Sequence, residues 1–166
     1  QKAKECYEKA IEINPNYVDA NNNLGNIFII LEELRKAKEC YEKVIEINPN
    51  YPDAHFNLGN LFEVLKEYPK AIIQYEKVIE INPKHFNSII NLGSVFNVIG
   101  DSKKSIEWYE KAIEIDPNHE LTIYSLGVVL FSIQQYKKAA EKFKSVNFRD
   151  SKSFLLNCFY KLDDKS

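Results

Sequence analysis

The chain has 166 residues, of which 45% are hydrophobic and 28% are charged, a composition typical of a globular protein rather than a disordered one. Its 22 basic residues nearly balance its 24 acidic ones, which argues against a dedicated nucleic-acid binder. No apolar run approaches the roughly 18 residues that span a bilayer, so we expect neither a nucleic-acid nor a membrane partner. The chain contains no Met and starts inside a repeat at Gln1, and we therefore expect it to be a piece of a longer protein.

A repeat of 34 residues runs along the whole chain. The segment Cys6–Tyr17 returns at Cys40–Tyr51 with a single change, Ala10 to Val44. A fixed period of this size is typical of one structural unit stacked on copies of itself. The recurring positions are Pro15, Pro49, Pro83 and Pro117; the pairs Leu24-Gly25, Leu58-Gly59, Leu92-Gly93 and Leu126-Gly127; and Tyr7, Tyr41, Tyr75 and Tyr109.

Each unit is predicted to contain two amphipathic helices. Residues 1–17 have the pattern of a second helix from a partial repeat. The units that follow are predicted at 18–51, 52–85, 86–119 and, in divergent form, 120–150, before a terminal helix and tail at 151–166. In the first of them, Leu24, Ile27, Phe28 and Leu31 share one helical face, and Glu32–Glu33 forms a break.

Prolines and a glycine mark the ends of these helices. Asn48-Pro49 predicts a helix end, because the residue before proline is disfavoured in the helical region. Pro52 and Pro69 are expected in first turns, where the missing N–H costs nothing, and Gly100-Asp101 is expected in the turn between two helices.

Glycine recurs in mid-helix, where it costs roughly 1 kcal/mol relative to alanine. We interpret this as a close approach of two helices, with a small residue of the second helix facing each glycine. The aromatic residue further along the second helix is then expected to fill the space between units. The glycines are Gly25, Gly59, Gly93 and Gly127; the small residues are Ala37, Ala71, Ser105 and Ala139; and the aromatic residues are Tyr41, Tyr75, Tyr109 and Phe143.

The last helix is predicted to begin at Ser151 as N-cap and to run to about Leu162. It is apolar nearly all round, whereas the final helix of a solenoid normally has a polar outer face. We expect this helix to be covered either by further chain of the parent protein or by a second copy. The second case is self-association through residues 151–162. The apolar residues are Phe154, Leu155, Leu156, Cys158, Phe159 and Tyr160.

The recurring Leu-Gly, alanine, tyrosine and proline positions resemble those of the tetratricopeptide repeat (TPR) family. The family's early tryptophan is replaced by Asn21, His55, Ile89 and Ile123. The resemblance implies an all-α fold, a right-handed α-α superhelix (TPR solenoid) of antiparallel helix pairs, and a role in binding other proteins.

In this family the first helix of each unit lines a concave groove that binds peptides. Transferred to this chain, the groove positions are Asp19, Asn22, Asn23, Asn26, Asp53, Phe56, Asn57, Asn60, Asn87, Ile90, Asn91, Ser94, Tyr124 and Val128, with Asn97, Leu121, Ser125 and Phe131 beside them. None is cationic, so a clamp for an acidic peptide tail or a terminal carboxylate is not expected.

Asn23, Asn57 and Asn91 are predicted to form a ladder that Ser125 ends, similar to that in the repeat region of O-linked N-acetylglucosamine transferase. An amide presents both a donor and an acceptor, so such a ladder can bind the backbone of an extended peptide. The alternative is that these asparagines reflect composition alone. The apolar end of the groove has an alternative as well, as internal core.

We find no catalytic, cofactor-binding or metal-binding motif, since the phosphate-binding, dinucleotide and zinc patterns are absent. Cys6 and Cys40 occupy equivalent positions on neighbouring repeats, too far apart for a disulfide, which favours a reducing, cytoplasmic location. The sequence therefore predicts a non-catalytic scaffold that binds a peptide or a partner helix. The alternative is a substrate-recruiting arm of a larger enzyme, a glycosyltransferase or an oxygenase.

Overall fold

The computed structural model describes residues 2–147 and 150–163, in which it contains ten α-helices and no strand. The all-α prediction is therefore confirmed for these residues. The chain divides into two compact units, Gln1–Pro83 and Lys84–Ser166. Two stretches on which predictions fall, residues 148–149 of the last repeat and 164–166 of the tail, lie outside the described residues, as does Gln1.

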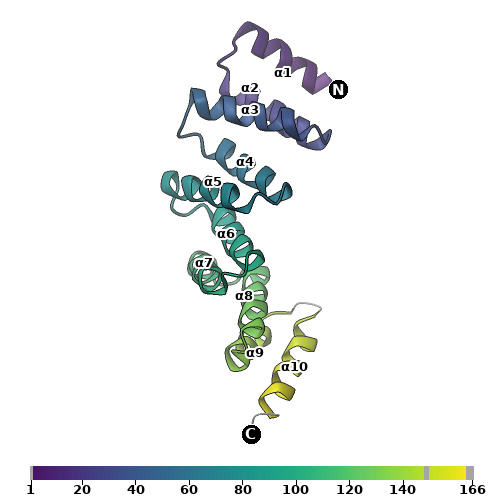
Figure 1. Ribbon diagram of the computed structural model, residues 1–166, viewed down its shortest axis with the longest axis vertical. Coiled ribbons are helices and arrows are strands. Elements are labelled where there is room, and N and C mark those ends of the chain that lie inside the picture. The colour runs from purple at the N-terminus through teal and green to yellow at the C-terminus, as the bar shows by residue number, and fades with distance from the viewer. Residues whose placement is uncertain (1, 148–149, 164–166) are drawn as a thin grey trace. The chain divides into compact units, whose positions relative to one another are not determined.

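The first unit consists of successive antiparallel helices that pack against their neighbours in the chain (Figure 1). α2 pairs with α3 and α4 with α5, while α3 also packs against α4 and α1 against α2. The helices are α1 (Lys2–Ile13), α2 (Val18–Ile30), α3 (Leu34–Ile47), α4 (Pro52–Val64) and α5 (Tyr68–Ile81).

The second unit repeats this arrangement and adds a last helix. α6 pairs with α7 and α8 with α9, α7 packs against α8, and α10 packs mainly against α9 and also touches α8. The helices are α6 (Phe86–Val98), α7 (Ser102–Ile115), α8 (Glu120–Ser132), α9 (Tyr136–Lys144) and α10 (Ser151–Asp163).

The turn inside each helix pair has one left-handed residue. Four equivalent positions have positive φ, at 58° for Glu32, 59° for Lys66, 84° for Gly100 and 63° for Gln134. The next amide then donates back into the preceding helix, as from Glu67 N to the Phe62 carbonyl at 2.8 Å. This bond pattern ends a helix by satisfying a carbonyl that would otherwise lack a partner. The breaks predicted at Glu32–Glu33 and at Gly100-Asp101 are confirmed.

The turns between pairs follow the proline positions. α3 ends at Ile47, directly before Asn48-Pro49, and Oδ1 of Asn48 accepts a hydrogen bond from the amide of Asn50 at 3.2 Å. The equivalent bonds at Asn14 and Asp116 measure 3.1 Å and 3.0 Å. Pro52 and Pro69 lie in the first turns of α4 and α5, as predicted.

The predicted role of the mid-helix glycines needs correction. The space beside each glycine is filled by the aromatic ring of the partner helix within the same pair, rather than by the small residue. A Cβ built on Gly59 would lie 2.7 Å from Cε1 of Tyr75, and one on Gly127 would lie 2.7 Å from Cε1 of Phe143. The aromatic residues therefore join the two helices of one pair. The small residues are nevertheless fully buried, and Ser105 donates from Oγ to the Gly93 carbonyl at 2.7 Å.

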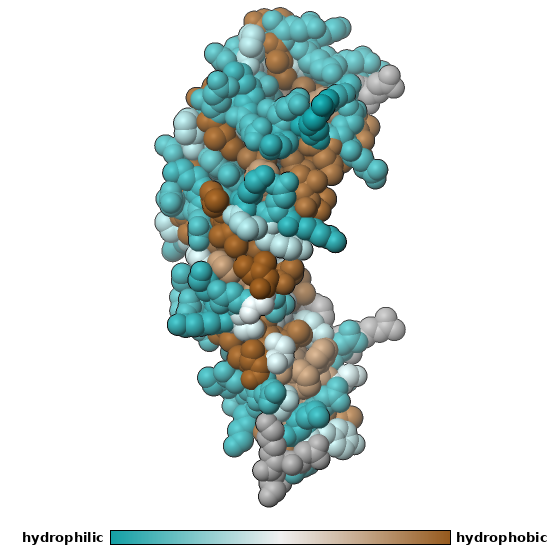
Figure 2. All heavy atoms as spheres, in the orientation of Figure 1, coloured by the Kyte–Doolittle hydropathy of each residue, from teal (hydrophilic) through white to brown (hydrophobic). Residues whose placement is uncertain are grey.

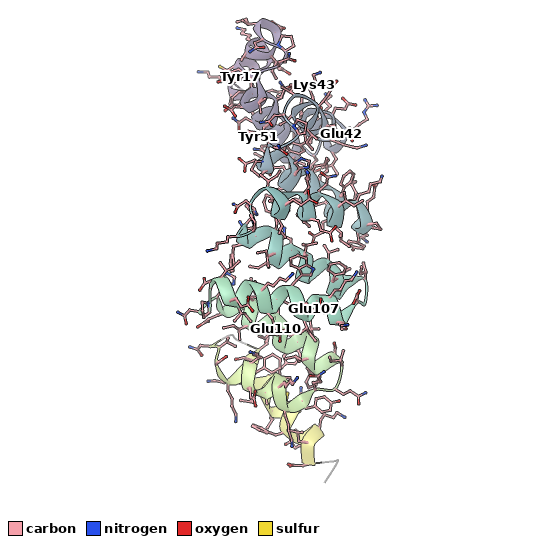
Figure 3. All side chains as sticks on the ribbon, turned by 90° about the vertical axis from the view of Figure 1, so that its left-hand side faces the viewer. Tyr17, Glu42, Lys43, Tyr51, Glu107 and Glu110 are labelled. Carbon is pink, nitrogen blue, oxygen red and sulfur yellow. The ribbon has the colours of Figure 1, made fainter. Side chains whose placement is uncertain are left out.

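The charged side chains that recur with the repeat lie on the outside of the helices. Glu42 and Glu110 are exposed, and both are labelled in Figure 3. Lys43 pairs with Glu46 at 2.9 Å, and Lys77 forms the equivalent pair at 2.8 Å. Hydrophobic residues nevertheless reach the surface in both units, between hydrophilic side chains (Figure 2).

The start of α10 differs from the prediction in one detail. The carbonyl of Asp150 accepts the first bond of the helix, from the amide of Phe154 at 3.1 Å, so Asp150 occupies the N-cap position. Ser151 lies inside the first turn and donates from Oγ to the Val146 carbonyl at 3.3 Å.

Candidate functional site

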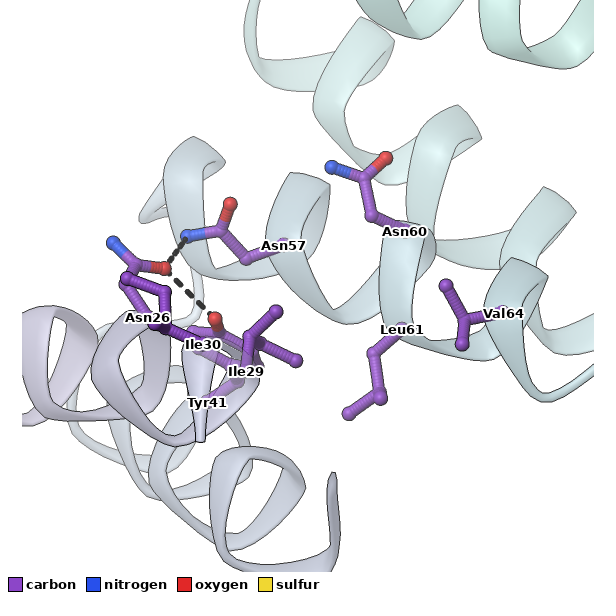
Figure 4. A pocket seen from close by; sticks show the side chains of 8 residues that line it. All are labelled: Asn26, Ile29, Ile30, Tyr41, Asn57, Asn60, Leu61 and Val64. Carbon is purple, nitrogen blue, oxygen red and sulfur yellow. Dashed lines mark hydrogen bonds between the residues drawn. The ribbon is translucent and has the colours of Figure 1, made fainter. Parts of the chain in front are cut away.

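The first unit contains a connected group of amide and tyrosine side chains, which we call the amide cluster: Asn22, Asn26, Tyr41 and Asn57. Asn57, on α4, donates from Nδ2 to Oδ1 of Asn22 at 3.2 Å and to Oδ1 of Asn26 at 3.0 Å, both on α2. The hydroxyl of Tyr41 donates to the same Oδ1 of Asn26 at 2.7 Å (Figure 4). Side chains from three helices are thus joined at one point.

The predicted ladder of Asn23, Asn57 and Asn91 concerns binding to a peptide and stays a prediction. Within the chain, Asn57 bonds to Asn22 and Asn26, one turn apart on α2. Asn23 is half-buried on the same helix. Asn22, Asn26 and Asn57 therefore belong to one hydrogen-bond network.

The tyrosine of the next helix pair also donates a hydrogen bond from its hydroxyl to polar side chains of the preceding helix. The hydroxyl of Tyr75 lies 2.8 Å from Oδ1 of Asn60 and 2.8 Å from Oε2 of Glu63, to which it donates. Tyr41 is similarly enclosed, and burial raises the pKa of its hydroxyl well above the usual value. The Tyr41 hydroxyl therefore stays protonated and acts as a donor at neutral pH.

An apolar hollow of about 310 Å³ opens beside the amide cluster (Figure 4). Asparagines and Tyr41 form part of its lining, and aliphatic side chains form the rest. Ile30 is 80% exposed and Val64 is 68% exposed, an unusual degree for such side chains at the ends of neighbouring helices. The residues lining the hollow are Asn26, Ile29, Ile30, Tyr41, Asn57, Asn60, Leu61 and Val64.

The charges on α2 and α4 are all negative. These two helices contain Asp19, Asp53 and Glu63 and neither lysine nor arginine. Asp19 accepts a hydrogen bond from the hydroxyl of Tyr51 at 2.9 Å. Burial, together with this bond and the charge of Asp19, raises the pKa of Tyr51 to about 12. The face that carries the hollow is therefore polar, apolar and weakly acidic, but not cationic.

Phe56, another predicted groove residue, is half-buried and lies with its ring centroid 6.0 Å from that of Tyr75. It packs within its own helix pair. Asp53 is exposed at the start of α4.

In the second unit the predicted groove residues separate into two groups. Asn87 is exposed at the start of α6, while Asn91 and Ser94 are half-buried on the same helix. The apolar members pack against the hydrophobic core of this unit instead. They are Ile90, Tyr124, Val128 and the neighbouring Phe131.

α10 supplies the ring that closes this apolar group. Phe154 stacks on Phe143 with ring centroids 5.2 Å apart and meets Phe131 edge to face at 5.5 Å. Tyr124 lies edge to face with Phe154 at 6.1 Å. The chain's own last helix therefore packs against the apolar end of the predicted groove. Leu156, Phe159 and Tyr160 remain exposed on the other side of α10.

The histidines have structural partners. Nδ1 of His85 accepts from the amide of Ser88 at 3.3 Å, and Nδ1 of His119 accepts from the amide of Thr122 at 3.3 Å, so both cap helices. His55 is buried between Oε1 of Gln74 and the Pro49 carbonyl, at 2.8 Å and 2.9 Å. Within the described ranges no group of three or more His, Cys, Asp or Glu side chains is arranged to hold a metal ion. No helix there is long and apolar enough to span a membrane.

Sequence reasoning missed the aliphatic part of the hollow. Ile29 and Ile30 fall between the core-stripe residues Phe28 and Leu31, and neither Leu61 nor Val64 was singled out from the sequence. The available signal was the pair Ile29-Ile30 at a helix end, where an outward isoleucine has no packing role. Tyr41 was identified for packing alone, and its hydroxyl bond to Asn26 was not anticipated.

The chain matches four models of the tetratricopeptide repeat, at residues 6–39, 25–65, 52–85 and 86–119. No curated protein sequence is similar enough to count as a match.

Among solved structures, the crystal structure of MamA has a TM-score of 0.81 at 23% identity, covering 98% of this chain and 88% of that one. YrrB, a TPR protein with an unusual peptide-binding site, has a TM-score of 0.80 at 23% identity over 95% and 80% of the two chains. PilF from Pseudomonas aeruginosa has a TM-score of 0.82 at 20% identity over 96% and 75%. These similarities establish the fold, a TPR solenoid of antiparallel helix pairs. With four family-model matches that together cover residues 6–119 and the same helix pairing, the chain belongs to the tetratricopeptide repeat family.

Proposed function

We propose that this protein is a non-catalytic interaction module that binds an extended peptide across α2 and α4 of the first unit. The observation that carries the proposal is the hollow beside the amide cluster, where exposed aliphatic side chains adjoin polar groups. An apolar pocket with a few convergent polar groups is the usual form of a ligand site. YrrB, which shares the fold, has a peptide-binding site, and this similarity supports the same class of ligand.

The polar groups suit the backbone of a peptide. Both N–H groups of Asn57 are used, in the bonds to Asn22 and Asn26, so its carbonyl oxygen is the group left to accept from a ligand amide. The Nδ2 group of Asn26, which lines the hollow, is a donor for a peptide carbonyl. Because the cluster is held by internal bonds, its side chains lose little freedom on binding. Each backbone bond contributes about 0.5–1.5 kcal/mol.

The hollow and the charges suggest the side chains of the ligand. One aliphatic or aromatic side chain fills the space among Ile30, Leu61 and Val64. Asp19, Asp53 and Glu63 favour lysine or arginine nearby and disfavour acidic residues. The ligand we propose is therefore a neutral to basic extended segment with one apolar anchor.

The test is selection of linear peptides from a random displayed library, followed by affinity measurements on variants of the hollow. Ile30→Ser and Val64→Ser remove exposed apolar surface and leave the core intact. We expect each to weaken the selected peptides about tenfold, equivalent to about 1.4 kcal/mol. Ile73→Ser is the matched control, because Ile73 is 60% exposed on α5 and does not line the hollow.

Two outcomes would refute this site. In one, the library yields no peptide that is enriched more on this protein than on an unrelated control protein of similar size. In the other, the selected peptides bind Ile30→Ser, Val64→Ser and Ile73→Ser equally well. Enrichment of acidic peptides would contradict the charge assignment.

We also propose that the protein is cytoplasmic. The support for this location is that Cys6, Cys40 and Cys158 are all free thiols in the structure. Absence of a nucleic-acid partner, self-association through α10 and the enzyme-arm alternative stay predictions from sequence.

A further inference from the structure

Glu63 is the acidic residue that lies next to the apolar end of the hollow. On α4 it directly precedes Val64, and Val64 lines this end together with Leu61 (Figure 4). Asp19 and Asp53, by contrast, are in the first turns of α2 and α4. Asp53 is about two turns, or roughly 12 Å, from Leu61 along the same helix. A ligand whose apolar side chain fills this end of the hollow therefore has Glu63 as its nearest acidic neighbour on these two helices.

Asn60 connects the Glu63 carboxylate to the hollow. Asn60 lines the hollow, and the hydroxyl of Tyr75 is 2.8 Å from its Oδ1 and 2.8 Å from Oε2 of Glu63. Since both oxygens contact the same hydroxyl, the carboxylate and the amide lie side by side on one face of α4, as residues three apart on a helix do. Glu63 is half-buried, so part of its side chain is open to solvent on this face.

Tyr75 holds this carboxylate in place. The tyrosine is completely buried, and its Cε1 is 2.7 Å from the place where a Cβ of Gly59 would lie. Its hydroxyl has one hydrogen to donate, and a carboxylate is a stronger acceptor than an amide oxygen. The bond from Tyr75 uses one of about four acceptor positions of the carboxylate, which leaves others for a ligand cation. Because the Glu63 side chain is already restricted, it loses less conformational entropy on binding than a mobile surface glutamate would.

Comparison with the preceding helix pair indicates that packing does not require the carboxylate. Tyr41 makes the same contact with Gly25, and its hydroxyl donates to Asn26 at 2.7 Å. The residue that corresponds to Glu63 in that pair is Ile29, which is 34 residues earlier and lines the hollow. Asparagine alone therefore satisfies a tyrosine of this kind, and an aliphatic residue is accepted at the position of the glutamate. The negative charge of Glu63 is available to a ligand rather than needed by the fold.

We propose that Glu63 determines the sequence specificity of the peptide site by binding a lysine or arginine two positions from the apolar anchor. This role rests on the proposed function and assigns its preference for basic ligands to one residue. In an extended segment, residues two apart are separated by about 6–7 Å and point to the same side. With the anchor between Leu61 and Val64, the next side chain on that side lies over α4, within reach of Glu63. The residue between them points away, so its identity is unrestricted.

The test compares a selected peptide that has lysine at this position with the same peptide carrying glutamine there. Affinities are measured by fluorescence anisotropy for the whole chain and for Glu63→Gln, which keeps the size of the side chain and an acceptor for Tyr75. We expect the unmodified protein to bind the lysine peptide about fivefold more tightly, a difference that shrinks at high salt. Glu63→Gln should bind the two peptides equally, and Glu63→Lys should prefer the glutamine peptide.

Glu76→Gln is the matched control, because Glu76 is exposed on α5, does not line the hollow and loses the same charge. It should keep the full preference for lysine, and circular dichroism checks that each variant is folded. The proposal is overturned if Glu63→Gln keeps that preference too, or if the selected peptides have no basic residue two positions from the anchor. In both results the peptides still bind and Ile30→Ser still weakens them, so the proposed function stands. If no peptide is selected at all, the proposed function fails and the role of Glu63 fails with it.

Discussion

The aromatic ring of Tyr41 occupies the place where a side chain at Gly25 would lie, with its Cε1 2.6 Å from the position of that missing Cβ. The same relationship joins Gly59 to Tyr75, and its members are 34 residues further along the chain. One contact therefore explains why two distant positions of the repeat, a glycine in the first helix and an aromatic residue in the second, recur together.

Replacing Gly59 by alanine should destabilise the protein by up to about 2 kcal/mol, because a collision cost of about 1–3 kcal/mol is only partly offset by a gain in helix propensity of about 1 kcal/mol. Urea unfolding followed by circular dichroism measures the effect. In a Tyr75→Ala background the ring is gone, so the same Gly59→Ala change should become stabilising. An unchanged sign in that background would contradict the contact.

Replacing Lys66 by glycine should stabilise the protein by about 1 kcal/mol, because Lys66 holds a left-handed conformation with φ of 59°. Lys66→Ala keeps the unfavourable conformation and should be nearly neutral. Gly100→Ala places a side chain on a residue that already has this left-handed conformation at the equivalent turn. It should destabilise the protein by a similar amount. Thermal unfolding of the three variants checks this order of stabilities. If Lys66→Ala stabilises the protein as much as Lys66→Gly does, the lysine side chain and not the backbone conformation is responsible.

The bond from Tyr41 to Asn26 can be measured by a double-mutant cycle. Tyr41→Phe should cost about 1 kcal/mol of stability. Asn26→Ala should cost more, because it also removes the acceptor of Asn57. The coupling between the two changes should be about 0.5–1.5 kcal/mol, and additive effects would mean that the 2.7 Å bond contributes nothing.

The three cysteines should react with a thiol reagent at different rates at pH 8. Burial, with the charge of Glu39, raises the pKa of Cys40 to about 11, and burial also raises the pKa of Cys158. Since only the thiolate reacts, a raised pKa lowers the reactive fraction at pH 8. Cys6 is exposed and should label first, at least ten times faster than Cys40. Cys6→Ser should remove the fast phase; a fast phase that survives would contradict this assignment.

The sequence predicted the helices well because their signals are local. A proline before or within a first turn affects only a few residues around it, and so does Gly100 with its φ of 84°. The same signals recur in four repeats, which made each of them stronger. The glycine partners were assigned wrongly because the choice between Ala37 and Tyr41 depends on how far the second helix is rotated, which periodicity alone does not determine.

The hydrogen bonds of the candidate site were beyond sequence reasoning for a related reason. Asn22, Asn23 and Asn26 are chemically identical, and only the angle between α2 and α4 decides which of them meets Asn57. The exposed Ile30 and Val64 carry no periodic signal, since they follow the last core residue of each helix.

The packing of each helix against its neighbours in the chain also affects how the protein is made. α2 meets α3, α3 meets α4, and α4 meets α5, so contacts within the first unit close short loops at little entropic cost. As the chain leaves the ribosome, each new helix finds its partner already synthesised. Apolar surface is then exposed for about one helix at a time, which limits aggregation during synthesis.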